Sequence, residues 1–219
     1  FLSVGDNPRN VAFSPEELNA AMAEANRLNV PVAAHAHATE GINQAIRAGA
    51  KSIEHGTYLD AESIRLMLKH DAFLVPTIYI GDYYTYESQD LRAQEKNDHY
   101  AKHERGDFLK RIGKAHKAGV KIAVGVDLGG LQYDPTLSAR ELALLMEAGM
   151  TPMEAIQAAT RVGAELLGKE DILGTLEVGK LADIIAVPGN PLEDISKLES
   201  VSFVMIDGKI AKQTKTPNQ

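Results

Sequence analysis

The residues of this 219-residue sequence that are best suited to chemistry are three histidines and one aspartate. His35, His37 and His55 lie near the start of the chain, and Asp127 lies past its middle. Neutral imidazoles and a carboxylate are the ligands with which proteins hold a catalytic zinc ion while leaving a position open for water. The sequence has no cysteine, so histidine and carboxylate side chains are the strong metal ligands that it offers. These residues predict a metal-dependent hydrolytic site if the fold brings them together.

A repeated helix–strand pattern predicts how these residues are positioned. Apolar segments that each follow a helical segment are typical of parallel strands buried on both faces. We expect helices over 15–28, 41–48, 61–70 and up to Gly119, and strands over 30–34, 50–54, 72–76 and 120–126. The strands end at His35, His55, Thr77 and Asp127, and the carboxyl ends of parallel strands are where such folds carry chemistry. Residues 14–168 are therefore predicted to be α/β of barrel type, with a doubly wound α/β sheet as the alternative.

The grouping of the four residues carries more weight than any one of them. Residues two apart on a strand share a face, so His35 and His37 are expected to point into the barrel together. A single histidine at a strand end more often forms a structural hydrogen bond than a metal bond. Three histidines and an aspartate at matching strand ends favour a shared site.

The C-terminal part of the sequence has a different texture. Two further helices are expected over 136–148 and 151–168, the second of them begun by a capping box at Thr151. Glycines and prolines then separate short apolar runs, which predict a small antiparallel sheet with a turn at Asp207-Gly208. We therefore predict a barrel domain over 1–170, a small β domain over 171–213 and a polar tail over 214–219.

Composition narrows the range of partners. The formal net charge is -7 and no run of Lys or Arg occurs, so a nucleic-acid partner is not expected. No apolar run reaches the roughly 20 residues of a membrane-spanning helix. A small-molecule ligand fits this balance better. The sequence opens at Phe1, so a preceding signal peptide stays open, as does the cellular compartment.

Several motifs together resemble the amidohydrolase superfamily, and most of all its imidazolonepropionase-like and Xaa-Pro dipeptidase-like subgroup. The motifs, in order, are Val32-Ala33-Ala34-His35-Ala36-His37, Ser52-Ile53-Glu54-His55-Gly56, Leu74-Val75-Pro76-Thr77 and Gly125-Val126-Asp127. They resemble the fifth to eighth strands of that family's barrel. The stretch Gly179-Lys180-Leu181-Ala182-Asp183-Ile184-Ile185 is similar to the family's return into its β-sandwich domain, and Asp207-Gly208-Lys209 to its closing hairpin.

The resemblance implies a fold and an activity. The fold is the C-terminal half of a TIM (β/α)8 barrel followed by strands of a composite β-sandwich domain. The activity is hydrolysis of a C–N bond in an amide, cyclic amide or dipeptide, with one or two divalent ions, expected to be zinc. His35, His55 and Asp127 would be metal ligands, and Asp127 would also carry the proton.

Four further residues are expected to contact substrate or to support the ligands. They are His37, Glu40, Tyr79 and Tyr83. For Glu40 an exposed carboxylate at a helix start is the slightly favoured explanation, and ordinary packing explains the tyrosines almost equally well. The remaining histidines, on helices away from the strand ends, are expected at the surface; they are His70, His99, His103 and His116.

The sequence also departs from the family pattern. A complete member adds a His-x-His pair from its first strand and, in the binuclear subgroup, a carboxylated Lys from its fourth. Neither is present, so the chain is expected to begin just after that Lys and to lack an N-terminal half. The first alternative is a non-catalytic half barrel or interaction module that needs a second copy, as a homo-oligomer, or the missing half. The second is a metal-free α/β binding protein.

Overall fold

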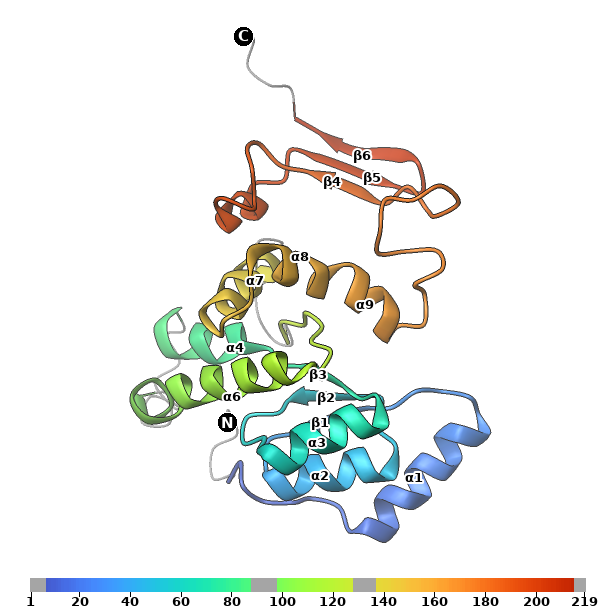
Figure 1. Ribbon diagram of the computed structural model, residues 1–219, viewed down its shortest axis with the longest axis vertical. Helices are drawn as coiled ribbons and strands as arrows, with labels where there is room; N and C mark the ends of the chain where they lie inside the picture. Colours follow the sequence, from blue (N-terminus) through green and yellow to red (C-terminus); the bar gives the residue numbers. More distant parts are fainter. Residues whose placement is uncertain (1–6, 88–97, 128–136, 215–219) are drawn as a thin grey trace.

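The computed structural model describes residues 7–87, 98–127 and 137–214, which form a mixed α/β structure (Figure 1). Its described strands form two separate sheets of three strands each. One sheet lies in the N-terminal half of the chain and the other near the C-terminus. Helices α7 (Leu137–Glu147), α8 (Pro152–Ala159) and α9 (Arg161–Leu166) lie between them in Figure 1. The predicted α/β class is confirmed.

The N-terminal sheet is parallel and is built in chain order. It consists of β1 (Ala33–Ala36), β2 (Ser52–His55) and β3 (Phe73–Val75). The extended segment over residues 120–126 joins the sheet next to β3, through a parallel bridge between Leu74 and Ile122. This sequential order fits the winding of a barrel, and one half of a doubly wound sheet has the same order.

Three helices lie beside this sheet, and the second of them packs directly against β1 and β2. They are α1 (Pro15–Arg27), α2 (Thr39–Ala48) and α3 (Ala61–His70), close to the predicted bounds. Ser14 and Glu17 form a capping box at the start of α1, and Gly49 ends α2 at φ 111°. Ile53 and Leu74, both fully buried, belong to the same apolar core as residues of α2 and α3. This core holds the strand ends in place.

The insertion between β3 and Gly119, residues 78–118, is helical where the structure describes it. It contains α4 (Ile78–Asp82), the π-helical turns η1 (Tyr83–Glu87) and η3 (Tyr100–Glu104), and α6 (Arg105–Ala118). Arg105 forms a bidentate ion pair with Asp82, with both N–O distances at 2.7 Å, and so ties α6 to α4. Gly119 ends α6 at φ 95°, as predicted.

The predicted strand over 120–126 is wrong as a regular strand. Its backbone bonds to β3 only around Leu74, whose N–H donates to the Lys121 carbonyl and whose carbonyl accepts from Ala123. β3 is three residues long and the chain turns into α4 soon after it, so there is little strand to pair with. The N–H of Val124 donates instead to the carbonyl of Ala158.

The next predicted helices form, with one difference. They are α7 (Leu137–Glu147), α8 (Pro152–Ala159) and α9 (Arg161–Leu166). The single helix predicted over 151–168 is therefore wrong, because Thr160 leaves helical geometry at φ -121° and ψ -88°. Its hydroxyl donates to the carbonyl of Ile156, which competes with a continuous helical ladder. Thr151 and Glu154 form the predicted capping box.

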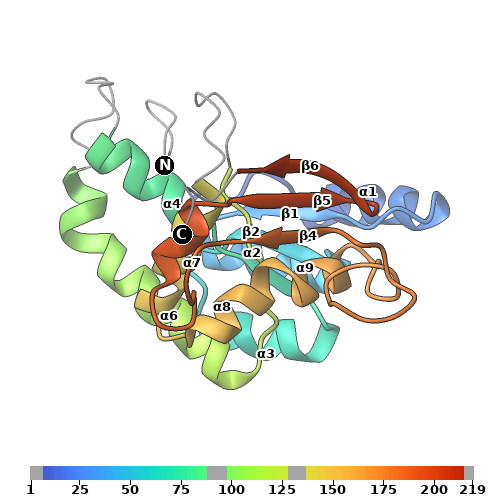
Figure 2. The ribbon, with the colours of Figure 1, turned by 90° about the horizontal axis from the view of Figure 1, so that it is seen from above.

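The C-terminal sheet is antiparallel, as predicted. It consists of β4 (Ile184–Ala186), β5 (Phe203–Ile206) and β6 (Lys209–Gln213), with the short 3-10 helix η4 (Ile195–Glu199) before β5. Figure 2 shows the paired strands β5 and β6 side by side. Asp207 and Gly208 form the predicted turn between them, both at positive φ. The predicted division near Asp171 stays a prediction, and residues 215–219 of the predicted tail lie outside the described residues.

No helix in the described ranges is both long and apolar enough to span a membrane.

Candidate metal centre

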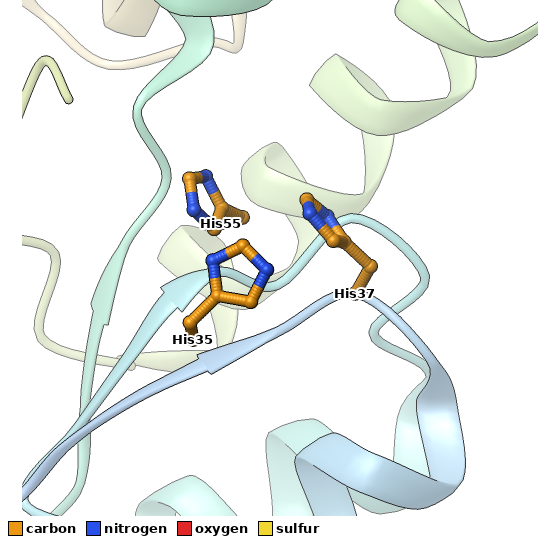
Figure 3. Close-up of side chains that lie close together, drawn as sticks. All are labelled: His35, His37 and His55. Carbon is orange, nitrogen blue, oxygen red and sulfur yellow. The ribbon is translucent and has the colours of Figure 1, made fainter. Parts of the chain in front are cut away.

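Three histidines gather at the carboxyl ends of β1 and β2 (Figure 3). His35 lies on β1, His37 lies just beyond it and His55 is the last residue of β2. Their ring centroids are 4.5 to 4.7 Å apart, and one possible ligand atom from each lies within 4.8 Å of the others. The structure thus brings together the three histidines singled out in the sequence.

The backbone of His55 explains how it joins this group. In the strand register Ala36 is opposite His55 and His35 is opposite Glu54, so regular alternation would place His55 on the face away from His35. His55 instead has a left-handed backbone, at φ 69°, and its ring lies 4.5 Å from that of His35. A histidine at positive φ is uncommon and costs energy, which makes it a mark of a functional position.

The same left-handed conformation recurs at the other two strand-end positions. Thr77 follows β3 at φ 50°, and Asp127 ends the extended segment at φ 51°. Together with His55, they place a polar side chain at the carboxyl end of each of three successive segments. The structure thus adds Thr77 to the site. The one sign of this role in the sequence was the position of Thr77 at a predicted strand end.

Two threonines hold two of the imidazole rings. Nδ1 of His37 lies 2.9 Å from Oγ1 of Thr57, and Nδ1 of His55 lies 2.6 Å from Oγ1 of Thr77. Both threonines are buried. A bond at Nδ1 fixes the ring and leaves Nε2 for another partner, which is how proteins commonly orient metal-binding histidines. Thr57 was not singled out in the sequence, because its contact depends on the folding of the chain after β2.

Asp127 lies beside this group and not inside it. Its Oδ2 is 3.9 Å from Nε2 of His55, which is too long for a hydrogen bond. At 3.9 Å the two atoms are near enough for both side chains to be ligands of one cation. The side chain of Asp127 is 47% exposed, so water can reach it. The Asp127 and His55 side chains therefore suit a shared cation better than a direct ion pair.

The surroundings keep two of the imidazoles neutral. Burial, followed by the charge of neighbouring imidazoles, lowers the pKa of His37 to about 2 and that of His55 to about 3. A neutral imidazole keeps the lone pair that a metal ion needs. Glu54 precedes His55 on β2, and its pKa is raised by burial and by the nearby charge of Asp127. The hydroxyl of Ser52 donates a hydrogen bond of 2.5 Å to Glu54, which opposes this rise.

A cavity of about 780 Å³ lies over the three histidines and Asp127. Its walls also include aromatic side chains from the helical insertion, namely Tyr84, Tyr100 and Phe108. Polar groups that converge at one wall of a mostly apolar cavity are typical of small-molecule sites. The arrangement can hold a cation and place an organic substrate against it.

The remaining candidates lie apart from this cavity wall. Tyr79 is buried, and its hydroxyl accepts a hydrogen bond from Arg140. Tyr83 packs against Tyr84, which lines the cavity while Tyr83 does not. Glu40 is exposed and accepts a hydrogen bond from Gln44 on its own helix, as a carboxylate at a helix start would. These positions favour packing and a contact along the surface of α2 over substrate contact.

The histidines expected at the surface are largely there. His70, His99 and His103 are exposed, whereas His116 is partly buried and lies 3.4 Å from a carboxylate oxygen of Glu154.

Comparison with known proteins gives the family. The model of the amidohydrolase family matches residues 1–211. Ochratoxinase from Aspergillus niger is 39% identical over 96% of this chain and 44% of its own length. The crystal structure of a Xaa-Pro dipeptidase with bound methionine in its active site is 42% identical, with a TM-score of 0.84 over 93% of this chain and 50% of that one. Imidazolonepropionase from Pseudomonas fluorescens is 33% identical over 80% of this chain and 40% of its own length.

The chain belongs to the amidohydrolase family, whose members are hydrolases with a TIM-barrel fold. It spans about half the length of the relatives that it matches. The resemblance stated from the motifs is thereby confirmed.

Proposed function

We propose that this chain carries half of the active site of a hydrolase that cleaves C–N bonds in an amide, cyclic amide or dipeptide with a zinc-activated water. The proposal rests on one observation, which is that His35, His55 and Asp127 lie close together at the carboxyl ends of the strands. Membership of the amidohydrolase family supports the reaction class. The names of the relatives, a dipeptidase and an ochratoxinase, support a small organic substrate.

The residues present fit a divalent ion. His35 and His55 would hold it with Asp127, since all three are neutral-nitrogen or carboxylate-oxygen donors of the kind that zinc prefers. The hydrogen bond between His55 and Thr77 supports this fit, because it leaves Nε2 of His55 turned to within 3.9 Å of Asp127. His37 lies in the same 4.8 Å group, so it is either a further ligand or a contact to substrate.

When bound, the ion supplies Lewis-acid chemistry that lowers the pKa of water from about 15.7 towards about 7 and polarises the scissile carbonyl. Asp127 accepts the proton of the attacking water on a carboxylate oxygen. It then delivers this proton to the leaving nitrogen, which departs as an amine. The water-accessible side chain of Asp127 at the strand end suits this transfer.

A second candidate function is a half barrel that needs another chain or segment to complete its site. Two observations favour it: β1 is an edge strand of the described sheet, and His35 on that strand is exposed. An unpaired edge invites pairing with a further strand. A homo-oligomer or an N-terminal half would each supply one, and further ligands with it.

Zinc binding by the purified chain tests the proposal. We expect zinc to remain with the chain after dialysis, at one or two ions per chain, as measured by plasma mass spectrometry. His35→Ala and His55→Ala should each lower the zinc content, and His70→Ala, which removes an exposed helical histidine, should leave it unchanged. Equal, non-zero zinc content in all four proteins would refute the site. No zinc in any of them would favour the half barrel that takes its remaining ligands from another chain or segment.

Turnover separates the two candidates. Hydrolysis of an Xaa-Pro dipeptide or an N-acyl amino acid by the zinc-loaded chain would favour a working site. Zinc binding without hydrolysis would favour the incomplete half barrel.

A further inference from the structure

Helix α4 begins without the side-chain cap that its sequence offers. Thr77 occupies the N-cap position, where a threonine hydroxyl commonly accepts a hydrogen bond from the helix's first N–H groups. It makes no such bond here. Its Oγ1 lies 2.6 Å from Nδ1 of His55, and its backbone is left-handed, at φ 50° and ψ 48°. The first N–H groups of α4 therefore need an acceptor from elsewhere.

Glu141 of α7 supplies that acceptor. Its two carboxylate oxygens accept from the N–H of Ile78 at 2.8 Å and from the N–H of Tyr79 at 2.7 Å. The side chain is fully buried, so its desolvation is costly unless both oxygens are bonded. Burial raises the pKa of Glu141 to about 8, and the two amide donors oppose that rise because they favour the ionised form.

We propose that Glu141 is a positioning residue for His55: it caps α4 in place of Thr77 and so leaves the Thr77 hydroxyl to hold Nδ1 of His55. The proposal rests on the proposed function, because it concerns how one of the expected metal ligands is aimed. With Nδ1 held in this way, Nε2 of His55 faces Asp127 across 3.9 Å. The chain of contacts runs from α7, through the start of α4, to the site.

Glu141 has a competing explanation as a mere tie between α4 and α7. Other contacts already make that tie. Arg140 donates to the hydroxyl of Tyr79 at 3.0 Å, and Arg105, which pairs with Asp82 at the end of α4, also reaches Glu147 of α7 at 2.9 Å. The loss of Glu141 would therefore leave the two helices packed while removing the acceptor at the start of α4.

The tautomer of His55 distinguishes the two explanations. For Nε2 to bind a cation, Nδ1 must carry the proton and donate it to Thr77. Long-range proton–nitrogen NMR spectra of the metal-free chain, recorded at one mildly alkaline pH, report which nitrogen carries the proton. In the unsubstituted chain we expect the Nδ1–H form of His55 to dominate.

Four variants test the route. Glu141→Gln removes one acceptor oxygen and places an amide N–H₂ against a backbone donor, so Thr77 should turn back towards the helix and the His55 tautomers should become mixed. Thr77→Val should produce the same mixture. Thr77→Ser, which keeps the hydroxyl, and Glu147→Gln, a change at the exposed end of α7, should leave the His55 signals unchanged.

Zinc affinity gives a second readout. Partners of metal-binding histidines typically contribute about 10-fold or more to affinity. We expect Glu141→Gln and Thr77→Val each to weaken zinc binding by about that factor, and the double variant to be no weaker than Thr77→Val alone, because both changes act through the same hydroxyl.

Three results would overturn the proposal. The first is an unchanged His55 tautomer in Glu141→Gln together with a lowered melting temperature, which would make Glu141 a structural residue only. The second is additive loss of zinc affinity in the double variant. The third applies if Glu141→Gln does not fold: Glu141→Asp keeps the charge but falls short of the helix start, and an unchanged His55 tautomer in that variant would overturn it as well.

The NMR test also stands apart from the proposed function. If His35→Ala and His55→Ala keep the full zinc content of the unsubstituted chain, the metal site fails, while the tautomers of the metal-free variants still decide whether Glu141 acts on His55.

Discussion

At the scale of single residues, the site depends on left-handed backbone geometry at His55, Thr77 and Asp127. Such geometry is unfavourable for residues other than glycine, and it persists only where the surrounding structure imposes it. In a regular strand, successive side chains would point to opposite faces of the sheet. The left-handed geometry here turns these polar side chains to the same site at the carboxyl ends of the strands. The chemistry of the residue and the conformation of its backbone are therefore both needed.

The first prediction concerns Asp127. Asp127→Asn keeps the shape of the side chain but removes a basic carboxylate, so proton transfer should be lost. We expect turnover of the active protein to fall by about 100-fold or more, with its circular dichroism spectrum and melting temperature unchanged. Steady-state kinetics measures this loss. Retention of most of the activity would rule out the proton-carrying role.

The second prediction concerns pH. The folded-state pKa of His37 is lowered to about 2 and that of His55 to about 3, below the unfolded value near 6.5. The unfolded chain therefore binds more protons below pH 6.5, and the stability contributed by these neutral rings is lost as the pH falls from there towards 3. We expect the metal-free chain to lose about 1 kcal/mol per pH unit for each histidine in this window.

Urea unfolding at a series of pH values in the presence of a chelator measures this slope. His37→Gln and His55→Gln should each have a shallower slope than the unsubstituted chain. Equal slopes would contradict the assignment of neutral, buried imidazoles.

At the scale of elements, the extended segment that carries Asp127 is held close to β3. A Cβ atom at Gly125 would lie 2.5 Å from a methyl carbon of Val75, so only glycine allows this approach. The segment is paired with β3 through one bridge, which makes the contact at Gly125 important for placing Asp127.

The third prediction follows from this contact. Gly125→Ala should push the segment away from β3, lower the free energy of unfolding by about 1–3 kcal/mol and weaken zinc binding. Gly106→Ala is the matched control, because that glycine lies in α6 and no atom of the described residues lies within 4 Å of an added Cβ. Chemical unfolding and zinc titration measure both effects. If the two variants behave alike, the close approach is not what positions Asp127.

At the scale of the whole molecule, the site joins parts of the chain that are distant in sequence. A metal ion held by β1, β2 and the segment that ends at Asp127 would bind the folded state and not the unfolded one. Ligands of that kind stabilise a protein by an amount that rises with the logarithm of their free concentration over the dissociation constant.

The fourth prediction is a metal-dependent melting temperature. Zinc at about 100 times its dissociation constant should stabilise the chain by about 2.7 kcal/mol, and a chelator should remove the gain. The double variant His35→Ala/His55→Ala should melt at the same temperature with and without zinc. Differential scanning calorimetry measures the shift, and an equal shift in that variant would place the zinc elsewhere.

Much of the local structure could be predicted from the sequence because its causes are local. The capping boxes at Ser14 and Thr151 satisfy helix N–H groups within four residues, and Gly49 and Gly119 end helices at positive φ. The alternation of helices and buried apolar strands likewise indicated a parallel sheet. His35, His37 and His55 were singled out because they follow those strands.

Tertiary structure alone decided how the site is assembled, because its contacts join residues that are far apart in the chain. The left-handed turn at His55, the threonine partners of the imidazoles and the place of Glu141 beneath α4, 63 residues from its partner Ile78, leave no local pattern in the sequence. Tyr79 is an example in which sequence position and tertiary contact differ. Its position after a strand predicted substrate contact, but in the structure its hydroxyl accepts a hydrogen bond from Arg140. Residue types set which chemistry is possible here, and long-range packing selects the side chains that meet to perform it.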